Sequence, residues 1–293
     1  MAVRARSIRL QWRRQVNYLI VGLGRRGALH LECIEESRKS QTVFTFDTRE
    51  SIMEVGADYR MALSKQIDSI LKWKRPLRLA VIATPPVSHM SILSLLLGLN
   101  CRVIVEKPIV SCAAEVSALE RLSRSERERV FVGYSERFNP VVAAARARIC
   151  ATVRAGGVQR LKFDRGRPES RLGYPAEPCL ELMVHDLDFV LNRVFPKSPT
   201  DGLVSCHSER LCTVSGLIDG IHVVLKSRWT EGGSISTAVV DDMKGRIEVD
   251  LSSGGDIGRM LALKNQLDIV ESTSASADVA GEIRVLRVLL DGR

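Results

Sequence analysis

Residues 18–27 read YLIVGLGRRG, and this stretch decides the fold of the 293-residue chain. Four apolar residues predict a short buried β-strand, after which a G-x-G-x-x-G turn leads into a helical pattern. In that setting Gly22 permits a tight turn, Gly24 lets the backbone approach a pyrophosphate, and Gly27 lets the helix pack on the strand. The helix N-terminus adds partial positive charge for the phosphates. The alternative interpretation is that the glycines only make a tight turn.

The next strand supports a dinucleotide site. Residues 43–46 read as that strand, and Asp47 ends it, 20 positions after Gly27. A carboxylate there accepts hydrogen bonds from the ribose hydroxyls and repels a 2′-phosphate, so the pattern favours NAD. NADP stays the alternative, because Arg25, Arg26 and Arg49 lie close enough in sequence to bind a 2′-phosphate. The residues expected to bind the cofactor here are Gly22, Leu23, Gly24, Arg25, Arg26, Gly27, Asp47, Thr48 and Arg49.

The alternation of strand and helix continues through the first half of the chain. Further strands are expected at 79–83, 102–105 and 130–133, with helices around 51–72, 87–98 and 111–124. This alternation predicts a doubly wound parallel α/β sheet. Ligands of such sheets lie beyond the carboxyl ends of the strands. The residues expected there to contact the cofactor are Ala83, Thr84, Pro85, His89, Glu106 and Lys107.

Two residues in these loops carry titratable side chains. His89 follows the 79–83 strand, and its position is also that of a solvent-facing residue at the start of a helix. Lys107 lies between Glu106 and Pro108 after the 102–105 strand. Proline fixes its own backbone φ and is the common site of cis peptide bonds, so this turn could aim the ammonium into a cleft. The alternative for Lys107 is an ordinary solvated lysine.

The second half has a different pattern. One helix is expected from Asn139-Pro140 to about 152, a strand at 158–164, a long helix at 179–193 and a last helix at 282–290. Strands are expected at 211–214, 221–228, 235–241, 246–250 and 266–270. Short connections between strands predict a mostly antiparallel open sheet in an α+β domain. We expect a basic N-terminal arm over 1–15, a dinucleotide-binding domain over 16–135, and a substrate-binding and oligomerisation domain over 136–293.

The long helix carries a polar row beside its apolar stripe. Glu181, His185 and Asp188 recur at spacings of four and three, so they lie on one side of a helix. Leu180, Met183, Val184, Leu187 and Val190 form the adjoining apolar stripe. Asp186 falls off the row and is expected to be a cap or a hinge contact. The alternative is a core helix with a solvated flank.

Composition narrows the class of protein. The net charge is +9 with few aromatic residues, so a stacking platform for nucleic acid is not expected, whereas phosphorylated small molecules fit the charge. No apolar run reaches membrane-spanning length, and no secretory signal is visible. Seven scattered cysteines without a C-x-x-C pair favour reduced thiols in the cytoplasm. No His, Cys or Asp set has convincing metal spacing, and Cys206-His207 is expected to be structural.

Five segments together resemble a known family. They are the GLGRRG turn, ATPPVSH (83–89), VIVEKP (103–108), VGYSERFNP (132–140) and the ELMVH of 181–185. The chain is similar to the glucose-fructose oxidoreductase / inositol dehydrogenase / MocA family of NAD(P)-dependent oxidoreductases, and within it looks most like UDP-N-acetylglucosamine 3-dehydrogenases. Two positions depart from the family pattern. Glu181 replaces the usual aspartate, and Glu177-Pro178-Cys179 replaces a glycine pair before the helix.

The resemblance implies an enzyme that oxidises a sugar hydroxyl to a ketone with NAD. It implies that Lys107 and His185 are the catalytic pair that handles the hydroxyl proton and the developing alkoxide, with Glu181 orienting or tuning them. The substrate would be a nucleotide sugar, a UDP-N-acetylhexosamine oxidised at its 3-hydroxyl. The residues expected to contact substrate are Lys107, Arg137, Asn139, Arg165, Tyr174 and His185. Further arginines suited to a pyrophosphate are Arg167, Arg171 and Arg228.

Two other functions stay open on the sequence alone. One is a reductase of an imine or a biliverdin-type tetrapyrrole, and the other is a non-catalytic dinucleotide-binding sensor. The family commonly assembles through the second sheet, so we expect a homodimer or homotetramer. Val223, Leu225, Val239 and Val240 are the residues expected to make that face apolar.

Overall fold

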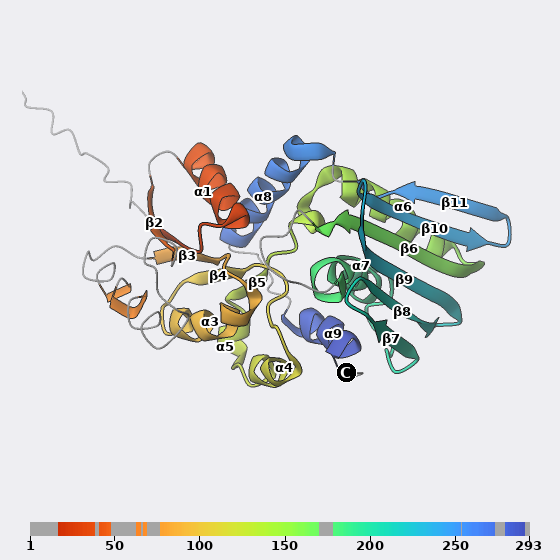
Figure 1. Cartoon of the computed structure of the whole chain (residues 1–293), viewed down its shortest axis with the longest axis horizontal. Helices are drawn as coiled ribbons and strands as arrows, with labels where there is room; N and C mark the ends of the chain where they lie inside the picture. The colour runs from red at the N-terminus through yellow and green to blue at the C-terminus, as the bar shows by residue number, and fades with distance from the viewer. Residues whose placement is uncertain are drawn as a thin grey trace, which may run out of the picture.

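The computed structural model describes residues 17–38, 41–47, 63–65, 67–68, 77–169, 178–252, 254–272 and 279–290. Five parallel strands form the first sheet, in the order β2-β1-β3-β4-β5 (Figure 1). They are β1 (Asn17–Val21), β2 (Thr42–Phe46), β3 (Leu77–Ile82), β4 (Arg102–Val105) and β5 (Val130–Val132). The parallel doubly wound sheet expected from the sequence is therefore confirmed, with β1 in the interior of the sheet.

Helices cover both faces of this sheet. The helices from the first half are α1 (Arg25–Ser37), the short turn η2 (Pro86–Ser88), α3 (His89–Leu97), α4 (Ala113–Glu120) and α5 (Arg124–Arg127). Alternate residues of β1 serve the two faces: Leu19 and Val21 belong to one core cluster, and Tyr18 and Ile20 to the other. Because both faces are buried, the strands are continuous apolar runs rather than alternating ones.

The second sheet is mixed but mostly antiparallel, in the order β11-β10-β6-β9-β8-β7. Its strands are β6 (Val158–Pro168), β7 (Leu203–His207), β8 (Leu211–Ile218), β9 (Ile221–Thr230), β10 (Ile235–Asp242) and β11 (Gly245–Asp250). Only β6 and β9, among these strands, pair in parallel. This confirms the expected open α+β sheet, which Figure 1 shows beside the first one.

The helices of the second half connect the two sheets. They are η3 (Ser135–Phe138), α6 (Pro140–Ala155), the continuous helical run η5 (Cys179–Met183), α7 (Val184–Phe189) and η6 (Val190–Val194), then α8 (Gly255–Glu271) and α9 (Val279–Leu290). The run η5-α7-η6 packs on the inner face of the second sheet, as the edge-on contact of Phe163 with Phe189 at 6.0 Å illustrates. None of the described helices is long and apolar enough to cross a bilayer.

Helix α8 corrects one expectation. Residues 266–270 were expected to be a strand, but they lie within α8. Leu263, Leu267 and Val270 are buried at spacings of four and three, which is a helical stripe rather than a strand alternation. This stripe packs on the first sheet beside α1, where Figure 1 places α8 next to the N-terminal helix. The division at residue 135 stays a prediction, because a helix from beyond it completes the cover of the first sheet.

Two further features of the second sheet differ from the expectation. Strand β7 was not predicted, and two valines and a leucine expected on the outer face of the sheet lie on its inner face. Strand β7 lies at a sheet edge with every second residue exposed, so it lacks the apolar content of a core strand. Val223, Leu225 and Val240 are fully buried in the core beneath the second sheet. They therefore do not form an outward apolar face. On the outer face of β9, Arg228 pairs with Asp164 of β6 at 2.6 Å.

Candidate functional site

The glycine turn after β1 has the shape that a dinucleotide pyrophosphate requires. Gly22 has φ +91°, and a Cβ there would lie 2.8 Å from the backbone of Ala83 and Thr84. A Cβ on Gly27 would overlap the carbonyl oxygen of Gly22. At Gly24 a Cβ would meet nothing within 4 Å, so open space lies before the first turn of α1. The residues present thus fit a pyrophosphate held by backbone N–H groups at a helix N-terminus.

Asp47 lies beside this turn, as expected. Its carboxylate accepts a hydrogen bond from the backbone N–H of Leu23, which ties the end of β2 to the glycine turn. Arg25 is exposed, whereas Arg26 is committed to Glu106 through its Nε and Nη2 atoms at 3.0 and 2.7 Å. Thr48 and Arg49 lie outside the described residues, as does Tyr174. Among the described residues the geometry therefore favours an unphosphorylated adenosine ribose.

Replacing Asp47 by asparagine is expected to weaken the preference for NAD over NADP. Asparagine keeps an acceptor oxygen for the Leu23 N–H but loses the charge that binds the ribose hydroxyls and repels a 2′-phosphate. A hydrogen bond to a charged group is worth about 1.5–3 kcal/mol, so we expect the ratio of the two dissociation constants to shift roughly ten- to a hundredfold. Calorimetric titration of both cofactors measures it, and an unchanged ratio would contradict the role of Asp47.

His89 joins two loops at the carboxyl ends of β3 and β4. It is 1% exposed, so the solvent-facing alternative does not hold. Its Nε2 lies 2.7 Å from the carbonyl oxygen of Thr84, and its Nδ1 lies 2.8 Å from that of Pro108. His89 thus links the loop expected beside the nicotinamide to the turn that carries Lys107, whose bond to Pro108 is cis.

Glu106 is a buried carboxylate held by helix α1. Besides Arg26, its Oε1 atom lies 2.8 Å from Nε2 of His30, which is fully buried. Burial alone would raise the pKa of Glu106, but Arg26 and His30 outweigh it and hold that pKa below its usual range. Gly133 makes room for this group, because a Cβ there would lie 2.9 Å from the Cα of Glu106. The turn before Lys107 is therefore fixed by ion pairs and close packing.

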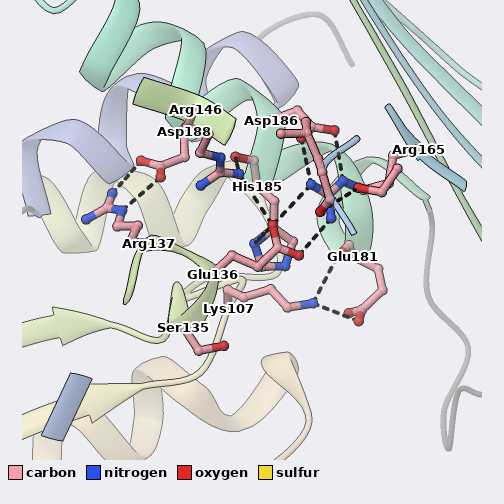
Figure 2. Close-up of polar contacts among 12 residues, drawn as sticks. Lys107, Ser135, Glu136, Arg137, Arg146, Arg165, Glu181, His185, Asp186 and Asp188 are labelled. Atoms are coloured by element: carbon pink, nitrogen blue, oxygen red, sulfur yellow. Dashed lines mark hydrogen bonds and ion pairs between the residues drawn. The ribbon is translucent and has the colours of Figure 1, made fainter. Parts of the chain in front are cut away.

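Lys107 reaches across to the helical run of the second half. Its Nζ atom lies 2.7 Å from Oε1 of Glu181 and donates a hydrogen bond to the backbone carbonyl of Glu181 at 2.9 Å (Figure 2). Both side chains are mostly buried, at 12% and 16% exposed. The resemblance gave Glu181 the role of orienting or tuning Lys107 and His185, and the structure places Glu181 in contact with Lys107 although 74 positions separate the two residues.

His185 lies next to this pair, one helical turn after Glu181. It is 7% exposed and packs edge-on against Tyr134 with ring centroids 5.6 Å apart. Its Nδ1 atom lies 3.9 Å from Oε2 of Glu136. Figure 2 shows the His185 ring between Lys107 and the buried acid–arginine network behind it. The two residues expected to be catalytic are therefore brought together from the turn after β4 and from helix α7.

The network behind His185 is centred on Arg165 and Glu136. The Arg165 guanidinium contacts Glu136 through Nη1 at 2.8 Å and binds Asp186 with two hydrogen bonds of 2.8 and 2.7 Å. Arg146 donates to Glu136 at 3.3 Å and to the backbone carbonyl of His185 at 3.2 Å. A buried charge is tolerated only when it is paired and hydrogen-bonded, and here both acids and both arginines are.

These charges set the protonation states in the site. Burial alone would raise the pKa of Glu136, but the guanidinium groups of Arg165 and Arg146 outweigh it and hold that pKa well below its usual range. For His185, burial lowers the pKa well below its ordinary value, and Lys107 and Arg165 act in the same direction. Glu136 opposes this only in part, since the arginines compensate its charge. His185 is therefore a neutral imidazole at neutral pH.

The remaining residues expected to bind substrate have partners within the protein. Arg137 binds Asp188 through two of its nitrogens, the Nε contact being 2.8 Å. Asn139 accepts a hydrogen bond from the N–H of Val141 at 3.0 Å and so caps α6. Arg165 is 1% exposed in the network above. A role for these three in binding substrate stays a prediction.

The sequence reasoning missed Glu136, Arg146, His30 and Gly133. Glu136 and Gly133 lie inside the 132–140 block that carried the resemblance, so that block held the available signal. Arg146 and His30 lie on helices at ordinary positions and become informative only when the fold places them beside buried acids.

Comparison with known proteins agrees with this geometry. Residues 16–134 match the family model described as an oxidoreductase family with an NAD-binding Rossmann fold. No curated protein sequence matches the chain closely enough to count as a relative. The parallel sheet and the glycine turn agree with this match, so residues 16–134 form an NAD-binding domain of the Rossmann class. Over these residues the chain is similar to the glucose-fructose oxidoreductase / inositol dehydrogenase / MocA family.

Solved structures of similar fold extend over nearly the whole chain. GenD2 from gentamicin A biosynthesis, solved in complex with NAD, superposes with a TM-score of 0.72 at 18% identity, covering 94% of this chain and 93% of that one. UDP-N-acetylglucosamine 3-dehydrogenase GnnA from Acidithiobacillus ferrooxidans gives 0.68 at 18%, covering 94% and 96%. A myo-inositol dehydrogenase from Corynebacterium glutamicum ATCC 13032 gives 0.67 at 16%, covering 94% of each chain. At these identities the likeness is one of fold.

Proposed function

We propose that the protein is a sugar dehydrogenase that oxidises a secondary hydroxyl to a ketone, with NAD as the hydride acceptor. The observation that carries the proposal is the meeting of Lys107 with the helix of Glu181 and His185 at the carboxyl ends of β4 and β5. A cofactor turn and a proton-handling pair at the same sheet edge are what alcohol oxidation requires. Neighbours of the same fold include proteins named as dehydrogenases of inositol and of a nucleotide sugar, which supports this class.

His185, Lys107 and Glu181 have different roles in the proposed reaction. When bound, NAD takes the hydride from the carbon that is oxidised. The neutral imidazole of His185 accepts the hydroxyl proton, and the ammonium of Lys107 stabilises negative charge on the oxygen as the proton leaves. Glu181 holds the Lys107 ammonium in place through the 2.7 Å contact. Atoms balance, since the alcohol loses one hydride and one proton and becomes a ketone.

The acid limb of the pH profile tests the role of His185. A base acts in its unprotonated form, so kcat/KM falls only when the pH drops below the pKa of His185. Burial depresses that pKa, and we expect the limb below the ordinary imidazole value of about 6.5. The same depression means that the unfolded chain takes up a proton first, so stability also falls as the pH drops below about 6.5. An acid limb at or above the ordinary value would contradict this assignment.

For the substrate we propose a UDP-N-acetylhexosamine oxidised at its 3-hydroxyl. The likeness to a protein named UDP-N-acetylglucosamine 3-dehydrogenase supports it. Among the arginines considered for a pyrophosphate, Arg165 is buried and Arg228 is paired with Asp164. Arg167 has a 42% exposed side chain, 3.6 Å from Glu136, and is the arginine best placed to bind phosphate oxygens beside the site.

A panel of UDP-sugars tests the reaction and the substrate separately. The purified protein is incubated with NAD and either UDP-N-acetylglucosamine, UDP-N-acetylgalactosamine, UDP-glucose or free N-acetylglucosamine, and reduced nicotinamide is followed by absorbance. We expect turnover with the UDP-N-acetylhexosamines and little with the free sugar. Turnover with UDP-glucose or the free sugar alone would support the proposed reaction but contradict the proposed substrate. NAD binding without turnover on any alcohol would instead indicate a sensor.

We further propose that the protein works in the cytoplasm as a homodimer or homotetramer. None of the seven cysteines, all of which lie among the described residues, is in a disulfide, which supports a reducing compartment. Light scattering of the purified protein measures the mass directly. A monomer at micromolar concentration would contradict the proposed assembly.

A further inference from the structure

Three potential metal ligands meet on the far side of the helix that carries Glu181 and His185. They are Cys179 at the start of η5, His207 at the end of β7 and Cys212 in β8. One ligand atom from each lies within 4.8 Å of the other two. No short sequence motif contains all three residues, because 28 positions separate Cys179 from His207. Cys206-His207 was expected to be structural, and the fold places Cys179 and Cys212 beside His207.

The geometry fits a tetrahedral cation. The Sγ atom of Cys212 lies 3.5 Å from the Nδ1 atom of His207. Zinc binds sulfur at about 2.3 Å and nitrogen at about 2.0 Å, and a tetrahedral angle then places the two ligand atoms about 3.5 Å apart. His207 and Cys212 face each other across the β7–β8 hairpin, so the sheet register itself fixes this pair. Cys179, at the start of the helical run that packs on this sheet, provides the third ligand.

The surroundings also suit a metal site. Cys179 and Cys212 are 1% and 0% exposed, and His207 is partly exposed although its Nε2 atom is buried. Two thiolates and one imidazole form a ligand set that soft and borderline cations prefer, and that hard cations such as Mg²⁺ do not. Packing of a hydrophobic core does not by itself require two thiols and a histidine to meet at one point.

We propose that Cys179, His207 and Cys212 bind one Zn²⁺, with a fourth ligand from solvent. The metal lies outside the proposed reaction and fixes the helix instead. Cys179 precedes Glu181 by two residues, and the β7–β8 hairpin belongs to the rigid second sheet. Zinc would therefore fasten the first turn of η5 to that sheet, at the point where Glu177-Pro178-Cys179 replaces the glycine pair typical of the family.

Cobalt titration of the full-length protein tests the site without reference to activity. The protein is purified under reducing conditions, stripped with a chelator and titrated with Co²⁺ alone. We expect about one Co²⁺ per chain, with thiolate charge-transfer bands and the intense visible bands of tetrahedral cobalt. Added Zn²⁺ should displace the cobalt and abolish both sets of bands.

Three variants locate the site. Cys179→Ser and Cys212→Ser should each abolish the charge-transfer bands or reduce them to those of a single thiolate. Cys206→Ser is the matched control, because Cys206 is exposed and adjacent to His207, and this variant should keep the wild-type spectrum. The wild-type titration stands even where a variant fails to fold. A wild-type spectrum without thiolate bands overturns the proposal, as does a Cys206→Ser spectrum that loses them, or mass spectrometry that finds a Cys179–Cys212 disulfide in the native protein.

Discussion

Replacing Lys107 by methionine is expected to lower kcat/KM for the sugar by about 10²–10⁴-fold. Methionine keeps the unbranched apolar part of the side chain but removes the ammonium that contacts Glu181 and stabilises the developing alkoxide. NAD affinity should change little, because the glycine turn and Asp47 bind the other end of the dinucleotide. Steady-state kinetics with NAD, together with calorimetry of NAD binding, separates the two effects.

The matched control for this variant is Lys162→Met. Lys162 is exposed on β6, so the same change there should leave kcat/KM unaltered. If Lys107→Met retains full turnover, the assignment of Lys107 is wrong. If it loses NAD affinity in parallel with turnover, the residue serves the cofactor rather than the hydroxyl.

Replacing Arg165 by methionine is expected to destabilise the fold by about 3–5 kcal/mol. The guanidinium compensates Glu136 and Asp186, and its loss leaves Glu136 with Arg146 as its buried cation and Asp186 without its bidentate partner. Replacing a whole buried ion network by apolar residues often leaves stability unchanged, but removing a single member leaves a buried charge unpaired. Urea denaturation followed by circular dichroism gives the change in free energy of unfolding.

The same substitution at Arg124 is the internal comparison. Arg124 and Glu128 also form an arginine–glutamate pair, at 2.9 Å, but their side chains are 93% and 62% exposed. An exposed pair of this kind contributes about 0.5 kcal/mol or less, so Arg124→Met should hardly shift the midpoint. Equal losses for the two variants would show that the Arg165 network does not hold this part of the fold together.

The first sheet could be predicted from the sequence because each of its strands is encoded by a short run of consecutive residues. A parallel strand buried on both faces is a short continuous apolar run, and the glycine turn marks where the first run meets its helix. The second half was harder to predict. The buried stripe of α8 was taken for a strand because only a short apolar segment was considered, and β7 lacked the apolar content of a core strand.

The candidate site could also be predicted only in part from the sequence. Lys107, Glu181 and His185 were found because they lie in segments that resemble a family, and the fold then placed Lys107 against Glu181. Glu136 and Arg146 could not be assigned to the site, because the local sequence does not distinguish a buried charged residue on a short turn or helix from an exposed one. The pairing of Arg165 with Asp186 spans 21 positions and depends on how β6 lies beneath α7, which no local pattern encodes.

Transfer of deuterium from substrate to cofactor tests the central claim most directly. UDP-N-acetylglucosamine that carries deuterium at C3 is incubated with the protein and NAD, and the products are analysed by mass spectrometry. The proposed reaction predicts a 3-keto sugar that has lost the label and a reduced nicotinamide that has gained it. Reduced nicotinamide without deuterium would contradict oxidation at C3, and unchanged NAD with every sugar tested would contradict the assignment of a sugar dehydrogenase.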